Sequence, residues 1–174
     1  MAQINRLNLP TAPVKAQLAN RILWNHGRTL DGADFFTVGY TGRQTDSLIE
    51  TMKHAGIRTL IDIRQNPVSM YRPDLSKSNL ARLVRSHGIA YEHAPALGVP
   101  RDIRAKAIDT GSRDVIWEWY DDAVVGPFSR NLYWLMNAVE APFAFMCVEI
   151  DPHECHRHRL SMALERMGLK GFDL

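Results

Sequence analysis

The sequence predicts an α/β protein: a single domain with a mainly parallel sheet and helices packed around it. Apolar runs of about four to eight residues, the length of a buried strand, alternate with segments in which apolar residues recur at helical spacing. The connections between these segments are short, and this alternation is typical of parallel sheets whose strands are joined by helices. No internal repeat or low-complexity tract indicates another architecture.

The 174 residues divide into an N-terminal extension, residues 1–33, and one α/β domain, residues 34–174, which is long enough to bury a full core. The extension carries the pattern of a short amphipathic helix, formed by Val14, Leu18 and Ile22 after Pro13, with Trp24 as an anchor. Such an arm either covers the core or reaches a partner subunit.

Within the domain, strands are expected at four apolar runs, residues 35–40, 59–64, 89–93 and 143–150. Helices are expected where apolar residues recur at helical spacing, at residues 48–55, 80–87, 115–123, 132–139 and 160–167. Gly56 and Gly88 stop the first two helices, and Ser76 is placed to cap the second.

The second strand carries two charges in an apolar context. Its alternation puts Asp62 and Arg64 on one face and Ile61 and Ile63 on the other. A buried carboxylate needs a partner, and Arg64 is close enough in sequence to supply one.

Candidate reactive groups are concentrated in residues 143–159, which contain both cysteines, three of the seven histidines and two arginines. After the strand, Asp151 is expected to cap a helix that has Pro152 at its first position and Glu154 where a capping box requires it. This helix would place Cys155 about one turn inside its start, where the helix dipole is weaker.

Composition argues against several classes of protein. No apolar run approaches the ~18 residues of a membrane span, and the N-terminus lacks the apolar region of a signal peptide. Two cysteines are too few for a disulfide framework, so we expect a cytoplasmic protein with no membrane association. The net charge of +2 does not by itself indicate nucleic-acid binding. Sixteen of the 21 basic residues are arginine, which suits phosphate and carboxylate ligands, although a GC-rich genome produces the same bias.

Ligands of parallel sheets bind outside the carboxyl ends of the strands, so the residues that follow the strands define a candidate site. These residues are Tyr40, Gly42, Arg64, Pro67, His93, Glu149 and Cys155. Their convergence at one edge of the sheet is stronger evidence for a site than any single motif.

Four segments, in this order, match one family: residues 37–43 (TVGYTGR), 60–69 (LIDIRQNPVS), 88–98 (GIAYEHAPALG) and 147–157 (CVEIDPHECHR). On these segments, and over about residues 36–160, the chain resembles the DUF488 family of small bacterial and archaeal α/β proteins, which is named for having no assigned function. The resemblance implies the α/β fold, a final strand near residues 170–174, and a candidate site that includes Ser69 and a Cys-His-Arg motif at residues 155–157. It implies no reaction.

The candidate catalytic residues are Cys155, His156 and Glu149. A cysteine near a helix start, beside His156 and Arg157, lies in surroundings that favour a thiolate. The alternative is that Cys155 is a buried small hydrophobe and that His156 is a hydrogen-bonded core histidine.

The candidate anion ligands are Arg64, Arg157 and free backbone N–H groups near residues 152–154. These groups predict a phosphate site between Arg64 and the helix that contains Cys155. The competing interpretation is that Arg64 pairs with Asp62 or Glu149 and has a structural role only.

A metal site is a further alternative, with Cys147, His153, Cys155, His156 and His158 as possible ligands. However, the chain has no Cys-x-x-Cys or His-Glu-x-x-His pattern, and adjacent Cys155 and His156 would diverge around a helix. We therefore assign no metal ligands from the sequence, expect no stoichiometric zinc or iron, and identify no cofactor.

Two classes of function fit these features. The protein is either an enzyme that acts on a phosphate-bearing small molecule, a nucleotide or a nucleic acid with Cys155, His156 or Glu149, or a binding module that recognises the same anionic group without chemistry. The sequence does not determine the oligomeric state.

Overall fold

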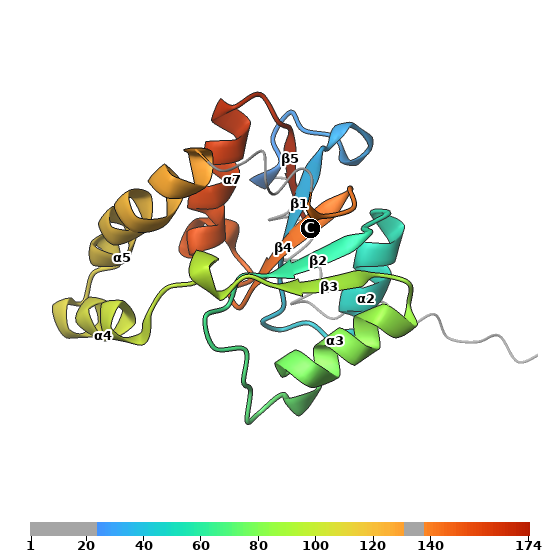
Figure 1. The fold of residues 1–174 in the computed structure, drawn as a ribbon, viewed down its shortest axis with the longest axis horizontal. Helices are drawn as coiled ribbons and strands as arrows, with labels where there is room; N and C mark the ends of the chain where they lie inside the picture. Colours follow the sequence, from blue (N-terminus) through green and yellow to red (C-terminus); the bar gives the residue numbers. More distant parts are fainter. Residues whose placement is uncertain (1–23, 131–137) are drawn as a thin grey trace, which may run out of the picture.

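A computed structural model of the chain describes residues 24–130 and 138–174. Within these residues five parallel strands form one sheet, and helices cover both of its faces (Figure 1). The strands are β1 (Phe35–Gly39), β2 (Thr59–Asp62), β3 (Ala90–His93), β4 (Phe143–Cys147) and β5 (Gly171–Asp173). The α-helices are α2 (Thr45–His54), α3 (Lys77–Ser86), α4 (Arg101–Thr110), α5 (Asp114–Tyr120) and α7 (His156–Arg166). The predicted class, a single α/β domain with a parallel sheet, is confirmed.

The strand order is β3-β2-β4-β1-β5, so β4 returns to the centre of the sheet between β1 and β2. In this register Gly39 of β1 pairs with Cys147 of β4, and Asp62 of β2 pairs with Met146. Because the strands are parallel, the carboxyl ends of β1, β2 and β4 meet at one edge of the sheet. Segments far apart in the sequence therefore place their loops side by side there.

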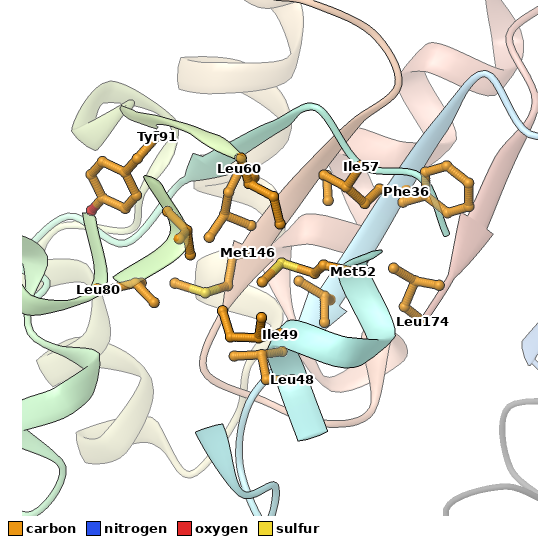
Figure 2. Packing of buried hydrophobic residues seen from close by; sticks show 14 of the residues in the cluster. Phe36, Leu48, Ile49, Met52, Ile57, Leu60, Leu80, Tyr91, Met146 and Leu174 are labelled. Atoms are coloured by element: carbon orange, nitrogen blue, oxygen red, sulfur yellow. The ribbon is translucent and has the colours of Figure 1, made fainter. Parts of the chain in front are cut away.

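Helices α2 and α3 cover one face of the sheet and bury an apolar core (Figure 1). In Figure 2, Leu48, Ile49 and Met52 of α2 point toward the sheet, with Met146 of β4 beside them. Leu80 of α3 and Leu60 of β2 are fully buried in the same cluster. The apolar spacing that predicted these two helices is the spacing of their buried faces.

Helices α4, α5 and α7 cover the opposite face, where the core is aromatic and contains sulfur. Phe143 and Phe145 pack edge to face at 5.4 Å between ring centroids. Cys147 lies two residues further along the same strand and therefore faces the same core. Leu160 and Leu164 of α7 close this core, as their spacing predicts.

The observed boundaries differ from the predicted ones mainly after β4. This strand ends at Cys147 rather than at residue 150, because the chain turns toward β1: a Cβ atom on Gly39 would lie 1.8 Å from the Glu149 carbonyl oxygen. Only glycine accepts a backbone that approaches so closely. The final strand expected near residues 170–174 is present as β5, which pairs in parallel with β1.

The predicted helix at residues 132–139 falls largely outside the described residues, and so do Val14, Leu18 and Ile22 of the N-terminal extension. The described end of the extension packs on the C-terminal strand. The Asn25 side chain donates to the Asp173 carbonyl and accepts from the Asp173 N–H, both at 2.8 Å. Over residues 24–130 and 138–174, no helix has the length and apolar character needed to cross a membrane.

A buried ion pair joins the end of β2 to the neighbouring strand. The carboxylate of Asp62, which has no exposed surface, accepts from Arg64 Nε at 2.8 Å and from Arg64 Nη2 at 2.6 Å. Tyr91 of β3 donates its hydroxyl to the same carboxylate at 2.7 Å. The predicted pairing of Asp62 with Arg64 is confirmed, and it is bidentate, the strongest geometry for such a pair.

Replacing Tyr91 by Phe tests the contribution of this network to stability. The variant keeps the ring but removes one hydrogen bond to a buried carboxylate, so we expect the free energy of unfolding to fall by about 1.5–3 kcal/mol. Tyr71→Phe is the matched control, because Tyr71 is 97% exposed and should leave stability unchanged. Urea unfolding of both variants measures the difference, and equal stability of the two would contradict the assignment.

Candidate functional site

A cavity of about 560 Å³ opens at the carboxyl edge of the sheet. Its wall combines residues that follow β1, β2 and β4 with residues of α4, α5 and the start of α7, among them Tyr40, Arg64, Asn66, Arg104, Arg113, Trp117, Cys147, Glu149 and His156. This is the position at which parallel sheets bind their ligands. The cavity is large enough for a small molecule.

At one end of the cavity lies a buried group of Cys147, Cys155 and His156, which we call the Cys/His cluster. One ligating atom from each residue lies within 4.8 Å of the other two. Nδ1 of His156 is 3.9 Å from Cys147 Sγ and 4.0 Å from Cys155 Sγ. Both cysteines are free thiols, and all three side chains are at most 9% exposed.

The three members of the cluster do not all line the same cavity. Cys147 and His156 line the large cavity. Cys155 lies behind them and borders a second recess of about 250 Å³. Trp117 contributes to the walls of both spaces. The predicted catalytic Cys155 is therefore not among the residues that line the large cavity.

The turn before α7 explains how adjacent residues in sequence enter one cluster. A short 3-10 helix, η5 (Pro152–Glu154), follows β4, and the Asp151 side chain caps it by accepting from the His153 N–H at 2.9 Å. The backbone of Cys155 is then extended, with φ −128° and ψ 142°, and Cys155 is the N-cap residue of α7.

The prediction of one continuous helix from Asp151, with Cys155 one turn inside, is wrong. Residues 152–154 form a separate turn, so Cys155 sits at the helix start, where the dipole is strongest. The expectation that Cys155 and His156 diverge fails for the same reason, because only His156 is in the helix.

The expected free N–H groups near residues 152–154 are also not free. The His153 N–H donates to the Asp151 side chain, and the Glu154 and Cys155 N–H groups donate to the carbonyls of Asp151 and Pro152. The turn thus uses its own donors, and that part of the predicted phosphate site has no basis in this geometry.

Arg157 connects the turn to the centre of the sheet. Its guanidinium, in a side chain 1% exposed, donates to the carbonyls of Glu149 at 2.5 Å and Ile150 at 2.9 Å, and to Thr37 Oγ1 of β1 at 3.1 Å. Thr37 in turn donates to the Asp173 carboxylate of β5. Arg157 does not line the cavity, and each of its three nitrogens already has an acceptor in the protein.

The surroundings shift the pKa values of the two thiols in opposite directions. Burial alone raises the pKa of Cys155, but hydrogen bonds from Cys147 and His156, with the positive charges of His156 and Arg157, outweigh burial and hold that pKa well below its ordinary value. The hydrogen bond to Cys155, followed by burial, raises the pKa of Cys147 well above its ordinary value. Burial and the negative charge at Cys155 raise the pKa of Glu149.

Of the other predicted site residues, Tyr40 and Arg64 line the cavity. The Arg64 guanidinium is bound to Asp62 and donates also to the Leu75 carbonyl at 2.9 Å, which leaves Nη1 facing the Tyr40 hydroxyl at 3.4 Å. Of the two interpretations of Arg64, this geometry favours the structural one.

The remaining predicted ligands, Gly42, Pro67, Ser69 and His93, are absent from the walls of the cavity and serve the loops around it. Gly42, with φ 76°, forms the turn after β1. Ser69 donates its N–H to Ser76 Oγ at 3.0 Å and Pro67 accepts from the Lys77 N–H, so both hold the loop before α3. His93 Nε2 contacts the Arg64 carbonyl at 2.9 Å.

Sequence reasoning did not select Arg104, Arg113 and Trp117, which line the cavity, and it named Cys147 only as a possible metal ligand. Alternation with Phe143 and Phe145 could have placed Cys147 on the functional face of β4. No sequence signal separates Arg104 and Arg113 from the other arginines. Arg113 pairs with Glu154 at 3.0 Å, whereas the exposed Arg104 guanidinium has no partner in the part of the chain that the structure describes.

Comparison with known proteins identified one family. A family model described as "Domain of unknown function DUF488" matches residues 44–164, more than half of the chain. A search of curated proteins and a search of solved structures found no match. The resemblance inferred from the sequence motifs is confirmed.

Replacing Arg157 by Lys distinguishes its structural role from an anion-binding one. A lysine keeps the charge but does not reach three separated acceptors, so we expect a loss of stability of about 1–3 kcal/mol for each buried acceptor left without a donor. Arg159→Lys on the same helix is the control, because the contacts of Arg159, a pair with Asp121 and a position over the Trp117 ring at 5.7 Å, are partly exposed. Chemical unfolding measures the loss. Unchanged stability in Arg157→Lys, with weaker phosphate binding, would instead support the ligand role.

Proposed function

The chain belongs to the DUF488 family, a domain of unknown function, and we propose that it is an enzyme that binds a small phosphate-bearing substrate in the cavity and acts on it beside the Cys/His cluster. The observation that supports this proposal is the composition of one cavity. Cys147 and His156 of the Cys/His cluster line it, the Glu149 carboxyl lies beside them, and the wall includes an arginine with no partner among the described residues. Such convergence of titratable groups in a cleft is typical of active sites.

The anionic part of the substrate is assigned to Arg104 of α4. The two other cavity arginines are already engaged, Arg64 by Asp62 and Arg113 by Glu154. Arg104 has neither hydrogen-bond nor ion-pair partner for its guanidinium among residues 24–130 and 138–174. A free guanidinium on a concave wall suits a phosphate oxygen pair, which it binds in a bidentate manner.

The reacting end of the substrate is assigned to the side chains that the cavity exposes near the cluster. Glu149 and His156 both line the cavity, and Cys147 Sγ donates to Glu149 Oε2 at 3.4 Å. A carboxyl and an imidazole on one wall supply the acid and base of a proton-transfer step. Trp117 offers a flat apolar surface for the non-phosphate part of the substrate.

Removing the Arg104 charge tests substrate binding. A panel of nucleotides and sugar phosphates is first screened for compounds that raise the melting temperature, because a ligand that binds only the folded state stabilises it. Calorimetry then gives the affinity of the best compound. We expect Arg104→Ala to weaken binding roughly tenfold to a hundredfold, in a salt-sensitive way, since a charge-assisted hydrogen bond contributes ~1.5–3 kcal/mol.

Arg101→Ala is the matched control, because Arg101 is an exposed arginine on the same helix that does not line the cavity. An equal loss of affinity in the two variants would mean that the change in net charge, and not a direct contact with Arg104, weakens binding. A panel in which no compound binds would overturn the proposed substrate class.

Replacing Glu149 by Gln distinguishes an enzyme from a binding module. We expect turnover of the bound compound to fall by about 10²–10⁴, the usual contribution of a general acid or base, while its affinity changes little. Glu118→Gln, an exposed carboxyl on α5 outside the cavity, should leave turnover unchanged. Tight binding with no turnover in the wild-type protein would support the non-catalytic alternative.

A further inference from the structure

We infer that Cys147, Cys155 and His156 bind a zinc ion through Cys147 Sγ, Cys155 Sγ and His156 Nδ1, with a fourth coordination position open toward the cavity beside Glu149. The site as a zinc site stands on the geometry of these residues alone. Its use in catalysis rests on the proposed function.

The two sulfur–nitrogen distances are close to those of a tetrahedral zinc site, and the two sulfur atoms lie within 4.8 Å of each other. Zinc bonds of about 2.3 Å to sulfur and 2.0–2.1 Å to nitrogen place a sulfur and a nitrogen ligand about 3.6 Å apart. His156 Nδ1 lies 3.9 Å from Cys147 Sγ and 4.0 Å from Cys155 Sγ. A movement of a few tenths of an ångström by each side chain would complete the site.

The types of ligand atom in the cluster favour zinc over other common metal ions. Two thiols and one imidazole form a soft, nitrogen–sulfur ligand set, which zinc prefers and which magnesium and calcium avoid. All three side chains are at most 9% exposed, so the ion would be largely removed from water. Thiolates buried in an apolar core are otherwise costly, and a bound cation offsets that cost.

The position of the cluster leaves room for a fourth ligand. Cys147 and His156 line the cavity, and so does Glu149, whose Oε2 atom lies 3.4 Å from Cys147 Sγ. Three protein ligands with one position open to a cavity are the arrangement of catalytic zinc sites, in which the ion binds a water molecule or the substrate. A zinc ion here would supply a Lewis acid, and Glu149 lies where it can accept a proton from that fourth position. With His156 held as a zinc ligand, the proton transfer of the proposed reaction would be carried out by Glu149 alone.

The surroundings fix the ligands in place. The ring of Tyr120 packs on the His156 imidazole at 5.0 Å between centroids, and its hydroxyl donates to the Leu97 carbonyl at 2.7 Å. The buried guanidinium of Arg157 supplies a positive charge next to Cys155. Such supporting contacts orient metal ligands and balance their charge.

The sequence argued against zinc on two grounds, a missing ligand motif and the divergence of Cys155 and His156 around a helix. The structure removes the second ground, because Cys155 precedes α7 and has an extended backbone. It also explains the first: one ligand comes from a strand end and two from a helix start, so no short motif is needed to bring them together.

Metal analysis of the full-length chain, purified without a histidine tag and loaded with zinc chloride alone, tests the inference. After removal of free metal we expect about one zinc per chain in the wild type and less than about a tenth in Cys147→Ser and His156→Gln. Cobalt loading should give the intense visible bands of a tetrahedral ion and a near-ultraviolet sulfur-to-metal band. Circular dichroism verifies that each variant is folded.

His158→Gln is the matched control, since His158 lies two residues further along α7 and its ring packs against His153 at 4.5 Å between centroids, outside the cluster. It should retain zinc and the cobalt spectrum. Loss of zinc from His158→Gln but not from His156→Gln, or a wild-type protein that binds no zinc with both thiols reduced, would overturn the inference. Formation of a Cys147–Cys155 disulfide in the wild type, with no zinc bound after reduction, would do the same.

Phosphate-compound binding, measured in parallel on the same metal-loaded and metal-free samples, separates this inference from the proposed function. If no zinc binds but Arg104-dependent binding persists, the zinc site is wrong and the substrate class stands. If zinc binds and no phosphate compound does, the zinc site stands alone.

Discussion

The site depends on the buried guanidinium of Arg157. It donates to the carbonyls of Glu149 and Ile150 and also to Thr37 of β1. These hydrogen bonds hold the segment after β4 against β1. Gly39 permits this approach, because any side chain there would collide with the Glu149 backbone. The same contact sets the start of α7, and Cys155 and His156 thereby come to lie over Cys147 of β4. Arg157 thus holds the end of a strand, a turn and the start of a helix together. The free-energy cost of burying its charge is offset by three hydrogen bonds, which supply donors to two carbonyls and a hydroxyl.

The two faces of the sheet have different roles. The face under α2 and α3 is almost wholly apolar and supplies stability through close packing. The face under α5 and α7 contains both cysteines and borders the cavity. At the carboxyl edge, buried polar groups form hydrogen-bonded networks, such as the Asp62 carboxylate with Arg64 and Tyr91. This division lets the second face carry reactive groups while the first maintains the fold.

The positive charge of the cavity depends on which of its arginines are paired with carboxylates, and not on how many arginines line it. Arg64 and Arg113 contribute little free charge, because each is neutralised by a carboxylate within 3.0 Å. Arg104 remains as the cation available to a ligand in the described part of the wall. The same cavity is lined by Cys147, His156 and Glu149, and Cys155 lies next to the first two. The cavity therefore combines one cationic side chain with a thiol, an imidazole and a carboxyl.

The sequence by itself determined the class of fold, the strands and most helices, the pairing of Asp62 with Arg64, and the concentration of reactive groups after β4. These features depend on local periodicity and on charges close in sequence, which are visible without a structure. Tertiary structure alone decided that Cys155 precedes the helix, that Arg157 is structural in its contacts, and that Arg104 has no partner within residues 24–130 and 138–174. Those outcomes depend on contacts between residues distant in sequence. Whether an arginine is free or paired, and whether a turn continues as a helix, is determined by which groups the folded sheet brings within hydrogen-bonding distance, and spacing along the chain does not record that.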